Sequence, residues 1–285
     1  MKICTSIAEA RAACDELRAR HRHSATRLGL VPTMGALHEG HLSLVRAAKA
    51  LCESVAISIF VNPTQFGPSE DLGRYPRRLE SDCAALEKEG ADLVFAPSIE
   101  EMYPASDTTW VTVEGLSDKL DGRSRPGHFR GVSTVVAKLF HILEPQAAFF
   151  GQKDAAQLAV IRRMVRDLNL PVEIVGCPIV REPDGLAMSS RNVYLNTAER
   201  QRALVLRRSL LRVERAFRAG ERSALRLAEV GRAEFAAEPE VQLDYFEIVD
   251  PDTLEPVASI TENTLVAAAA AVGSTRLIDN VILEP

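Results

Sequence analysis

Short apolar runs alternate with helix-length segments through the first two-thirds of this sequence, and this alternation most constrains its fold. The strand-like runs are too short for helices and lie at 28–33, 54–61, 91–95 and 147–150. Helix-length stretches lie at 41–51, 132–143 and 154–168, the last with an apolar stripe of Leu158, Ile161, Val165 and Leu168. Such alternation predicts βαβ units and a parallel sheet of the α/β class, whose ligands bind at the carboxyl ends of the strands.

The pattern changes after residue 179. A turn-rich segment at 181–192 is followed by a long arginine-rich helical stretch at 197–238, with an apolar face of Leu206, Leu210, Val213 and Phe217. Three strand-like runs then close the chain at 243–249, 264–272 and 275–283, and the alanines at 267–271 indicate a tightly packed strand. We expect a first domain over 1–179 and a second, smaller α+β domain over 180–285.

Charge and apolar run length exclude several kinds of partner. The 34 Lys and Arg against 39 Asp and Glu give a net charge of −5, which argues against binding nucleic acid by bulk positive charge. Ten arginines between 200 and 232 suggest an RNA-binding face, but the interspersed Glu214 and Glu221 favour a solvated helix face. The longest apolar run, 265–272, is far shorter than the roughly 20 residues of a membrane span. Neither a nucleic acid nor a membrane is an expected partner.

The cysteines carry no pattern of a disulfide or metal framework. They are five in number, widely spaced, and include no CxxC pair and no histidine at metal-site spacing: Cys4, Cys14, Cys52, Cys83 and Cys177. The N-terminal segment also lacks the apolar core of a signal peptide. We therefore expect reduced, buried thiols in a cytoplasmic protein.

The segment PTMGALHEGH at 32–41 joins the first expected strand to the next helix. Gly35 and Gly40 permit tight turns and close approach of a ligand, and a helix N-terminus favours phosphate. His38 and His41 add donors for a polyphosphate, although their spacing alone also suits two surface histidines. A zinc site of the HExxH type requires that histidine spacing and a third ligand, and neither is evident in the sequence. The strand–glycine–HxGH–helix context favours a nucleotide site.

Two polar turns follow other expected strands. In 60–68, Asn62 and Gln65 offer amides that suit a small polar substrate, although either could instead cap a turn. In GQKD at 151–154, Lys153 can hold a phosphate as a point charge. Asp154 is placed either as a helix N-cap or as a magnesium ligand beside substrate phosphates, and Gln157 lies on the same helix face.

A fourth segment, MSSR at 188–191, lies between the expected domains. Its two hydroxyls and one guanidinium can clamp a phosphate chain, although such a turn is common by chance. The segment gains weight only as a member of the set of four.

These four segments, in this order, resemble the pantoate–β-alanine ligase (pantothenate synthetase) family of the HxGH nucleotidyltransferase superfamily. The resemblance runs nearly end to end and includes RPGHFRGVSTVVAKLF at 125–140 and STRLIDN at 274–280. It implies a Rossmann-like N-terminal domain, a smaller C-terminal lid domain and a homodimer. It also implies ATP-dependent condensation of (R)-pantoate with β-alanine to pantothenate, through pantoyl adenylate, with release of pyrophosphate and AMP and with Mg²⁺ as cofactor.

The resemblance also assigns site residues. It implies that His41, as an acid, His38 and Lys153 are catalytic, that Gln65 and Gln157 bind pantoate, and that Gln65 also lies beside β-alanine. Asp154 would be the magnesium ligand. The implied ATP-binding residues are Met34, Gly35, Ala36, Leu37, His38, Glu39, Gly40, His41, Gly151, Gln152, Lys153, Asp154, Val180, Met188, Ser189, Ser190 and Arg191.

Two other features bear on that resemblance. Ala155 and Ala156 stand where the family usually has aromatic or Gln residues, which predicts a slightly altered pocket wall. The loop at 69–77 looks like the family's flexible gate. One alternative is a related HxGH nucleotidyltransferase that acts on a phosphorylated acceptor. Such an enzyme would need additional basic residues facing the acceptor, whereas Gln65 and Gln157 better suit a hydroxyl-bearing acid without a phosphate. A nucleotide sensor or an RNA-binding protein using the arginine-rich helix is an alternative of another class.

Overall fold

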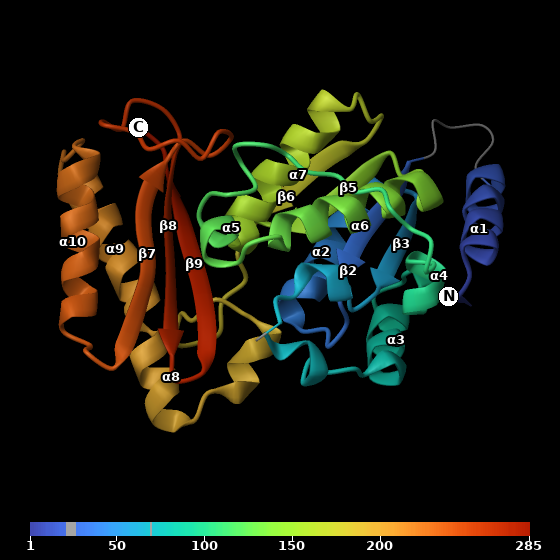
Figure 1. Ribbon diagram of the computed structural model, residues 1–285, viewed down its shortest axis with the longest axis horizontal. Helices are drawn as coiled ribbons and strands as arrows, with labels where there is room; N and C mark the ends of the chain where they lie inside the picture. The colour runs from blue at the N-terminus through green and yellow to red at the C-terminus, as the bar shows by residue number, and fades with distance from the viewer. Residues whose placement is uncertain (21–26, 69) are drawn as a thin grey trace.

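Six parallel strands form the sheet of the first two-thirds of the chain. The computed structural model describes residues 1–20, 27–68 and 70–285 (Figure 1). Every neighbouring pair of strands is parallel. In sheet order the strands are β1 (Lys2–Cys4), β4 (Leu93–Phe95), β3 (Ser54–Ile59), β2 (Leu28–Thr33), β5 (Ala147–Gly151) and β6 (Glu173–Cys177). This confirms the predicted parallel α/β sheet, and the chain order reverses between β2 and β5, which makes that gap the switch point where ligands bind.

Helices cover both faces of this sheet. They are α1 (Ile7–Arg20), α2 (Glu39–Leu51), α3 (Leu79–Lys88), α4 (Ile99–Met102), α5 (Asp121–Ser124), α6 (His128–Leu143) and α7 (Ala155–Asp167). Helices α1, α6 and α7 bury one face, to which β5 gives Ala148 and Phe150. Helices α2 and α3 bury the other, to which β5 gives Ala147 and Phe149. The alternation along β5 is the period of two that a strand covered on both sides requires.

Element ends differ from the expectations in physically simple ways. The expected strand at 54–61 stops at Ile59, because the chain turns toward a short 3-10 helix, η1 (Pro63–Gln65). The expected strand at 91–95 begins only at Leu93. The expected helix at 41–51 begins at Glu39, and the one at 132–143 begins at His128. The expected apolar stripe of α7 ends early, since Leu168 follows the helix and is 52% exposed.

The last third builds a three-stranded antiparallel sheet in the order β7 (Val241–Val249), β8 (Thr264–Val272) and β9 (Thr275–Leu283). Two helices, α9 (Val205–Arg218) and α10 (Ala224–Ala236), pack on its outer face (Figure 1). Its inner face, with Ala267 and Ala269, joins the core of the first sheet's helices. The alanine strand is therefore buried on both sides, as its composition predicts.

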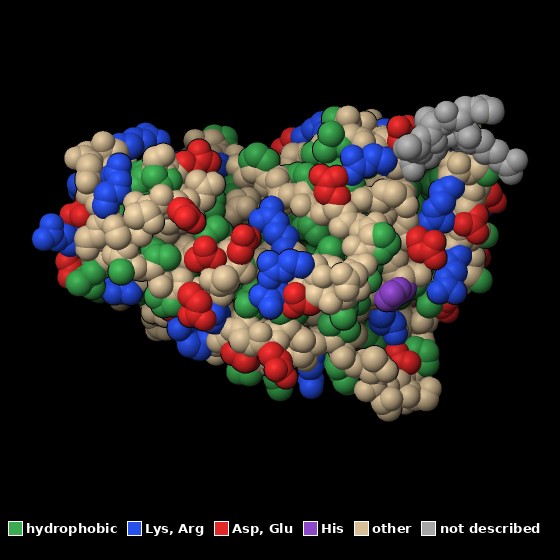
Figure 2. Space-filling view, turned by 90° about the horizontal axis from the view of Figure 1, so that it is seen from above, with side chains coloured by type: hydrophobic (Ala, Val, Ile, Leu, Met, Phe, Trp, Pro, Cys, Tyr) green, Lys and Arg blue, Asp and Glu red, His purple; other side chains and the backbone are tan. Residues whose placement is uncertain are grey.

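The helical stretch expected over 197–238 is confirmed, but it is divided into separate helices. The segment forms three helices, α8 (Thr197–Ala203), α9 and α10, and Gly220 between the last two adopts a φ of 102° that ends α9. The apolar face of α9 is buried as expected. Most of its arginines pair with carboxylates, as Arg208 does with Glu238. Basic and acidic side chains are interspersed on the face shown in Figure 2.

Close packing in the second unit depends on one glycine. A Cβ atom on Gly231 of α10 would lie 2.1 Å from the ring of Phe246 on β7, so only glycine lets the helix approach the sheet.

The expected domain division at 1–179 and 180–285 stays a prediction, since the hydrophobic core is continuous between the two sheets.

All five cysteines are free thiols, and all except Cys83 are buried. Burial raises their pKa values, that of Cys14 to about 12, which favours the protonated thiol over the thiolate. Within 1–20, 27–68 and 70–285, no helix combines the length and apolar character needed to cross a membrane.

Candidate active site

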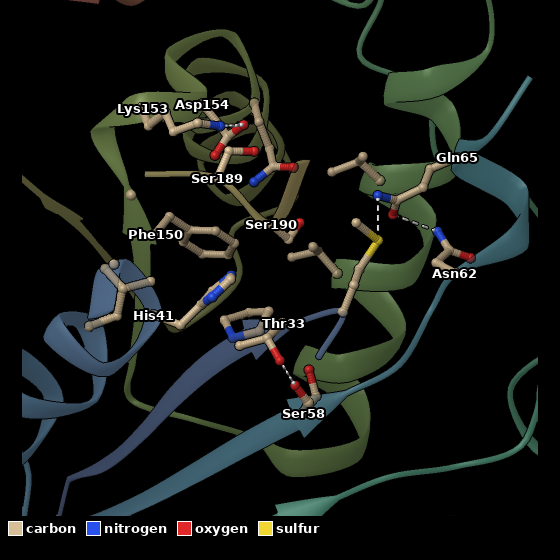
Figure 3. Close-up of a pocket in the computed structure, with 18 of the residues that line it drawn as sticks. Thr33, His41, Ser58, Asn62, Gln65, Phe150, Lys153, Asp154, Ser189 and Ser190 are labelled. Atoms are coloured by element: carbon tan, nitrogen blue, oxygen red, sulfur yellow. Dashed lines mark hydrogen bonds and ion pairs between the residues drawn. The ribbon is translucent and has the colours of Figure 1, made fainter. Parts of the chain in front are cut away.

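A pocket opens at the switch point between β2 and β5, and all four polar segments singled out from the sequence meet there (Figure 3). Two helix N-termini, those of α2 and α7, enter it. The expected site residues that line it are Met34, His38, Gly40, His41, Gln65, Gly151, Lys153, Asp154, Gln157, Val180, Met188, Ser189, Ser190 and Arg191. Five expected ATP residues do not line it: Gly35, Ala36, Leu37, Glu39 and Gln152.

The HxGH turn presents two histidines as hydrogen-bond donors. The Gly40 N–H donates to Nδ1 of His38 at 3.1 Å, and the His38 N–H donates to Nδ1 of His41 at 3.3 Å. A neutral imidazole that accepts at Nδ1 carries its proton on Nε2. Burial lowers the pKa of both rings, and together with neighbouring His38 it lowers the pKa of His41 to about 3. Both rings therefore offer a neutral Nε2–H.

Gly40 is required by this turn. A Cβ atom there would lie 2.9 Å from the His38 ring, which folds back over the start of α2 as its N-cap. The two imidazole centroids are 4.1 Å apart, so a shift of the His38 ring would also disturb His41. The glycine of HxGH thus permits the contact that orients both rings.

Asp82 on α3 fixes the loop before the histidines. Its buried carboxylate accepts hydrogen bonds from the N–H groups of Ala36 and Leu37, each at 2.9 Å. Gly35 and Ala36 both adopt a positive φ, which lets the loop turn these N–H groups toward α3. Sequence reasoning missed Asp82, because nothing in an ordinary amphipathic helix distinguishes one carboxylate that points inward.

The Gln65 side of the pocket is held by buried amides. Asn62 is nearly inaccessible, and its Nδ2 donates to Oε1 of Gln65 at 3.0 Å and to the Gly131 carbonyl at 3.2 Å (Figure 3 shows the first bond). Asn62 also caps η1 by accepting from the Thr64 N–H, so it serves the capping role left open from the sequence. Gln65 instead turns its Nε2 toward the sulfur of Met34 at 3.2 Å, inside the pocket.

Lys153 and Asp154 lie on the opposite wall, in the short helix η3 (Gln152–Asp154), at 3.5 Å from one another (Figure 3). Asp154 occupies the N-cap position of α7, yet its side chain makes no capping hydrogen bond. Asn280 on β9 supports this turn, since its Nδ2 donates to the carbonyls of Gln152 and Lys153 at 2.9 Å each. This contact gives the STRLIDN segment a structural role that the sequence did not show.

The MSSR segment meets the expected gate. Ser189 caps the 3-10 helix η4 (Ser190–Tyr194), and the Ser190 hydroxyl lies 3.2 Å from the Tyr75 hydroxyl. Arg191 forms a two-point ion pair with Asp71, at 3.0 and 2.9 Å. The gate residues 70–77 therefore dock on the segment between the sheets. Ser69, the first residue of the expected gate, lies outside the described residues.

The charges in the pocket suit a magnesium–phosphate ligand. The Lys and Arg side chains that line it are Lys153, Arg125 and Arg191, and Asp154 is the carboxylate among its described lining residues. Mg²⁺ commonly takes one or two carboxylates and completes its shell with water and substrate phosphates, which this donor set fits. No group of three or more His, Cys, Asp or Glu side chains that could hold a metal occurs within the part of the chain that the structure describes.

Ala155 and Ala156 do not form part of the wall. Both are buried in the core of the first sheet's helices, and the next residue, Gln157, is the one that lines the pocket. The slightly altered wall expected from these alanines stays a prediction.

A polar pocket at the switch point of a doubly wound parallel sheet, entered by two helix N-termini, is typical of nucleotide-binding α/β proteins. A family model described as Pantoate-beta-alanine ligase matches residues 2–282. The chain belongs to the pantoate–β-alanine ligase family.

Relatives and solved structures agree with that assignment. The chain is 59% identical to the pantothenate synthetase of Koribacter versatilis, over 100% of this chain and 96% of the relative. It is 61% identical to that of Acidobacterium capsulatum, over 99% and 97%. The crystal structure of pantothenate synthetase from Thermus thermophilus is 47% identical and covers 100% of both chains with a TM-score of 0.93.

A further structure bears on ligands. It is a pantoate-beta-alanine ligase from Francisella tularensis complexed with beta-gamma ATP and beta-alanine. That chain is 31% identical to this one, covers 99% of this chain and 97% of its own, and has a TM-score of 0.80.

Proposed function

We propose that this chain catalyses the ATP-dependent condensation of (R)-pantoate with β-alanine to pantothenate. One observation carries the proposal: a single pocket has histidine and lysine side chains suited to phosphate on one wall and the amides of Asn62 and Gln65 on the other. His38, His41 and Lys153 make up the first wall, and Gln65 marks the second. The Francisella tularensis relative, complexed with beta-gamma ATP and beta-alanine, supports the choice of substrates.

In the first step an oxygen of the pantoate carboxylate attacks the α-phosphorus of ATP. The new O–P bond forms as the bond to the β-phosphate oxygen breaks, which yields pantoyl adenylate and pyrophosphate. The attacking carboxylate is already ionised at neutral pH, so no general base is needed. Catalysis then depends on holding the reactants in line and neutralising phosphate charge.

Residues of the first wall supply that neutralisation. Lys153 and Arg191 bring positive charge, and the Nε2–H groups of His38 and His41 donate to phosphate oxygens. The family resemblance makes His41 the acid of this step, and its Nε2–H is the proton that it offers to the phosphates. Asp154 would hold Mg²⁺ together with the phosphates, and the ion would add further charge neutralisation.

In the second step the free amine of β-alanine attacks the acyl carbon of the adenylate. A C–N bond forms, the acyl C–O bond breaks, AMP leaves, and the nitrogen loses its extra proton to solvent. Gln65 and Gln157 hold the pantoyl group through its hydroxyls. The gate at 70–77, docked on η4, keeps water from the reactive adenylate.

Other family properties belong to the same proposal. The mild negative charge and the free thiols suit a cytoplasmic enzyme, and the family resemblance supports a homodimer with a C-terminal lid over 180–285. Sedimentation of the purified chain at several concentrations tests the dimer, and a single monomeric species at all of them would contradict it.

Pyrophosphate release tests the proposed reaction. We expect none from ATP alone, about one equivalent per site after pantoate is added, and continuous turnover with AMP once β-alanine follows. Release that requires a phosphorylated acceptor in place of pantoate would support the related nucleotidyltransferase. RNA affinity that falls steeply with salt, without pantoate-dependent release, would support the RNA-binding alternative.

A further inference from the structure

Strand β9 forms the edge of the second sheet that lies nearest the first sheet (Figure 1). Its consecutive residues Asp279 and Asn280 are almost inaccessible, with exposures of 3% and 2%. Successive side chains of a strand point to opposite faces. Ile278 and Ile282 pack against the core of the first sheet's helices, so Asn280 shares that face and Asp279 lies on the other. The two polar side chains therefore reach different parts of the molecule.

Asn280 holds the turn that carries Lys153. Its Nδ2 donates to the main-chain carbonyls of Gln152 and Lys153 at 2.9 Å each, and its Oδ1 accepts from Nε2 of Gln152 at 3.4 Å. A lysine side chain is a flexible four-carbon stem, so the reach of its ammonium group depends on how firmly its backbone is held. Asn280 therefore limits where Nζ of Lys153 can lie in the pocket.

Asp279 holds a different element through Arg181. Its carboxylate accepts two hydrogen bonds from this guanidinium, from Nη1 at 2.7 Å and from Nη2 at 2.9 Å. The Nη1 group also donates to the Gly185 carbonyl at 3.1 Å, which closes the turn at 181–187. A two-point contact of this kind fixes orientation as well as distance.

The turn closed by Arg181 has pocket residues at its two ends. The Met188 N–H donates to the Val180 carbonyl at 3.0 Å, and both residues line the pocket. Ser189 and Ser190 follow directly and line it as well. The position of the two hydroxyls therefore depends on this turn, and the turn is tied to β9 through Arg181.

One strand thus holds two elements that would contact the same ligand. In the proposed first step, the triphosphate of ATP meets Lys153 from one element and the hydroxyls of Ser189 and Ser190 from the other. A displacement of about 1 Å in such a site can slow a reaction by about 100-fold. A buried ion pair contributes little net stability, because desolvation offsets the attraction. The geometry that the Asp279–Arg181 pair imposes therefore explains it better than stability does.

We propose that Asp279 and Asn280 are positioning residues that set the distance between Lys153 and the Ser189–Ser190 hydroxyls for attack at the α-phosphorus of ATP. The inference rests on the proposed function and concerns its first step. In the second step the bound adenylate has one phosphate, and no triphosphate spans the two elements. The distance should therefore matter for adenylate formation and much less for transfer to β-alanine.

The test measures the two steps separately. Adenylate formation is followed as pyrophosphate release in the first turnover with ATP and pantoate, and transfer as AMP release from synthetic pantoyl adenylate and β-alanine. In Asn280→Ala we expect adenylate formation to slow by about 30-fold and transfer by less than about threefold. Arg181→Lys keeps the charge but loses the two-point contact with Asp279, and it should slow adenylate formation by about tenfold.

A double variant tests whether both contacts fix one distance. Releasing either side releases that distance, so Arg181→Lys combined with Asn280→Ala should be little slower than Asn280→Ala alone. Independent effects would multiply, to about 300-fold. Asp244→Ala is the matched control, because Asp244 on β7 accepts from Oγ of Ser124 at 2.8 Å across the same junction without lining the pocket. It should keep both rates.

The outcomes distinguish this inference from the proposed function. Equal slowing of both steps in Asn280→Ala, a multiplied effect in the double variant, or an equally slow Asp244→Ala would show a packing role and overturn the inference. If Asn280→Ala fails to fold, an unchanged rate of adenylate formation in Arg181→Lys overturns it instead. Absence of pantoate-dependent pyrophosphate release by the wild-type protein would overturn the proposed function, and the inference with it.

Discussion

The two walls of the pocket are built in different ways. We call the wall with His38, His41 and Lys153 the phosphate wall, and the wall with the Gln65 turn the acceptor wall. On the phosphate wall, His38 and His41 are oriented by main-chain groups two and three residues away. On the acceptor wall, Arg125 meets Glu70 across 55 residues, and His128 meets the Gln65 carbonyl across 63. The histidine turn of the phosphate wall is organised by short-range hydrogen bonds, whereas the Lys153 turn on that wall is supported by Asn280 of β9. The acceptor wall exists only when the whole α/β unit has folded, and part of it belongs to the gate.

The largest expected effect is on the phosphate wall. His41→Ala and Lys153→Ala should each lower pantoyl adenylate formation by about 100-fold or more, the scale of losing a preorganised donor. The measurement is pantoate-dependent pyrophosphate release, with Lys49→Ala as the control, since Lys49 pairs with Asp92 outside the pocket lining. Near wild-type release by both variants would refute their assignment to the phosphate wall.

Asp82→Asn tests whether the loop before His38 keeps its shape without the carboxylate of α3. The variant leaves one of the two loop N–H groups facing an amide N–H in place of a carboxylate oxygen. We expect about a tenfold to 50-fold slower adenylate formation, from one lost charged hydrogen bond. Ser81→Ala, at an exposed neighbour on the same helix, is the control. An unchanged rate in Asp82→Asn would mean that the turn holds its shape without support from α3.

Gly131→Ala tests the packing of α6 against the Gln65 turn of the acceptor wall. A Cβ atom at this position would lie 2.4 Å from the Thr64 carbonyl oxygen, so η1 and Gln65 must move away from α6. Overpacking of this kind costs about 1–3 kcal/mol of unfolding free energy. Urea unfolding measures it, and the KM for pantoate should rise as well. Gly73→Ala, where nothing lies within 4 Å, should leave stability nearly unchanged.

Gln157→Ala should separate the binding of pantoate from the binding of ATP. Loss of one uncharged hydrogen-bonding group is expected to weaken pantoate binding by about tenfold. ATP binding should change little, because Gln157 is assigned to pantoate and not to the phosphates. Calorimetric titration with each ligand provides the comparison. An equal loss of both affinities would indicate a folding defect.

The last expected effect is a pH dependence of stability carried by His128. Burial and the neighbouring Arg125 lower the pKa of this ring to about 4, whereas an unfolded chain binds the proton near 6.5. The unfolded state therefore takes up the proton first, and stability falls as the pH drops from 6.5 toward 4, by at most about 1.4 kcal/mol per pH unit. Urea midpoints from pH 7 to 4 should fall less steeply in His128→Gln. Parallel curves would show that the buried ring is not the titrating group.

The same contrast explains what could be predicted from the sequence. The strands at 28–33 and 147–150 and the turns after them are local patterns, so periodicity and glycine placement predict both the sheet and the position of the phosphate wall. Strand β1 has too few residues to show a period, and the breaks between α8, α9 and α10 are hidden within one arginine-rich run.

The missed site residues share one property. Each of them contacts a partner that is distant in sequence, and the residues next to it in sequence give no indication of that contact. They are Asp82, Asn280, Arg125 and His128. Segments 125–140 and 274–280 entered the resemblance as motifs, but no role could be derived for Arg125 or Asn280 without the fold that places them.

The contacts of Asn280 limit how far this enzyme can be divided. The backbone of the Lys153 turn is held by this one residue of β9, across 127 residues of chain. A fragment covering 1–179 would contain His38, His41, Gln65 and Lys153, yet it would expose the apolar face that now meets Ala267 and Ala269. The C-terminal sheet therefore supports the backbone of the Lys153 turn directly. Domain exchange between relatives should succeed only when the Asn280 contact is transferred with it.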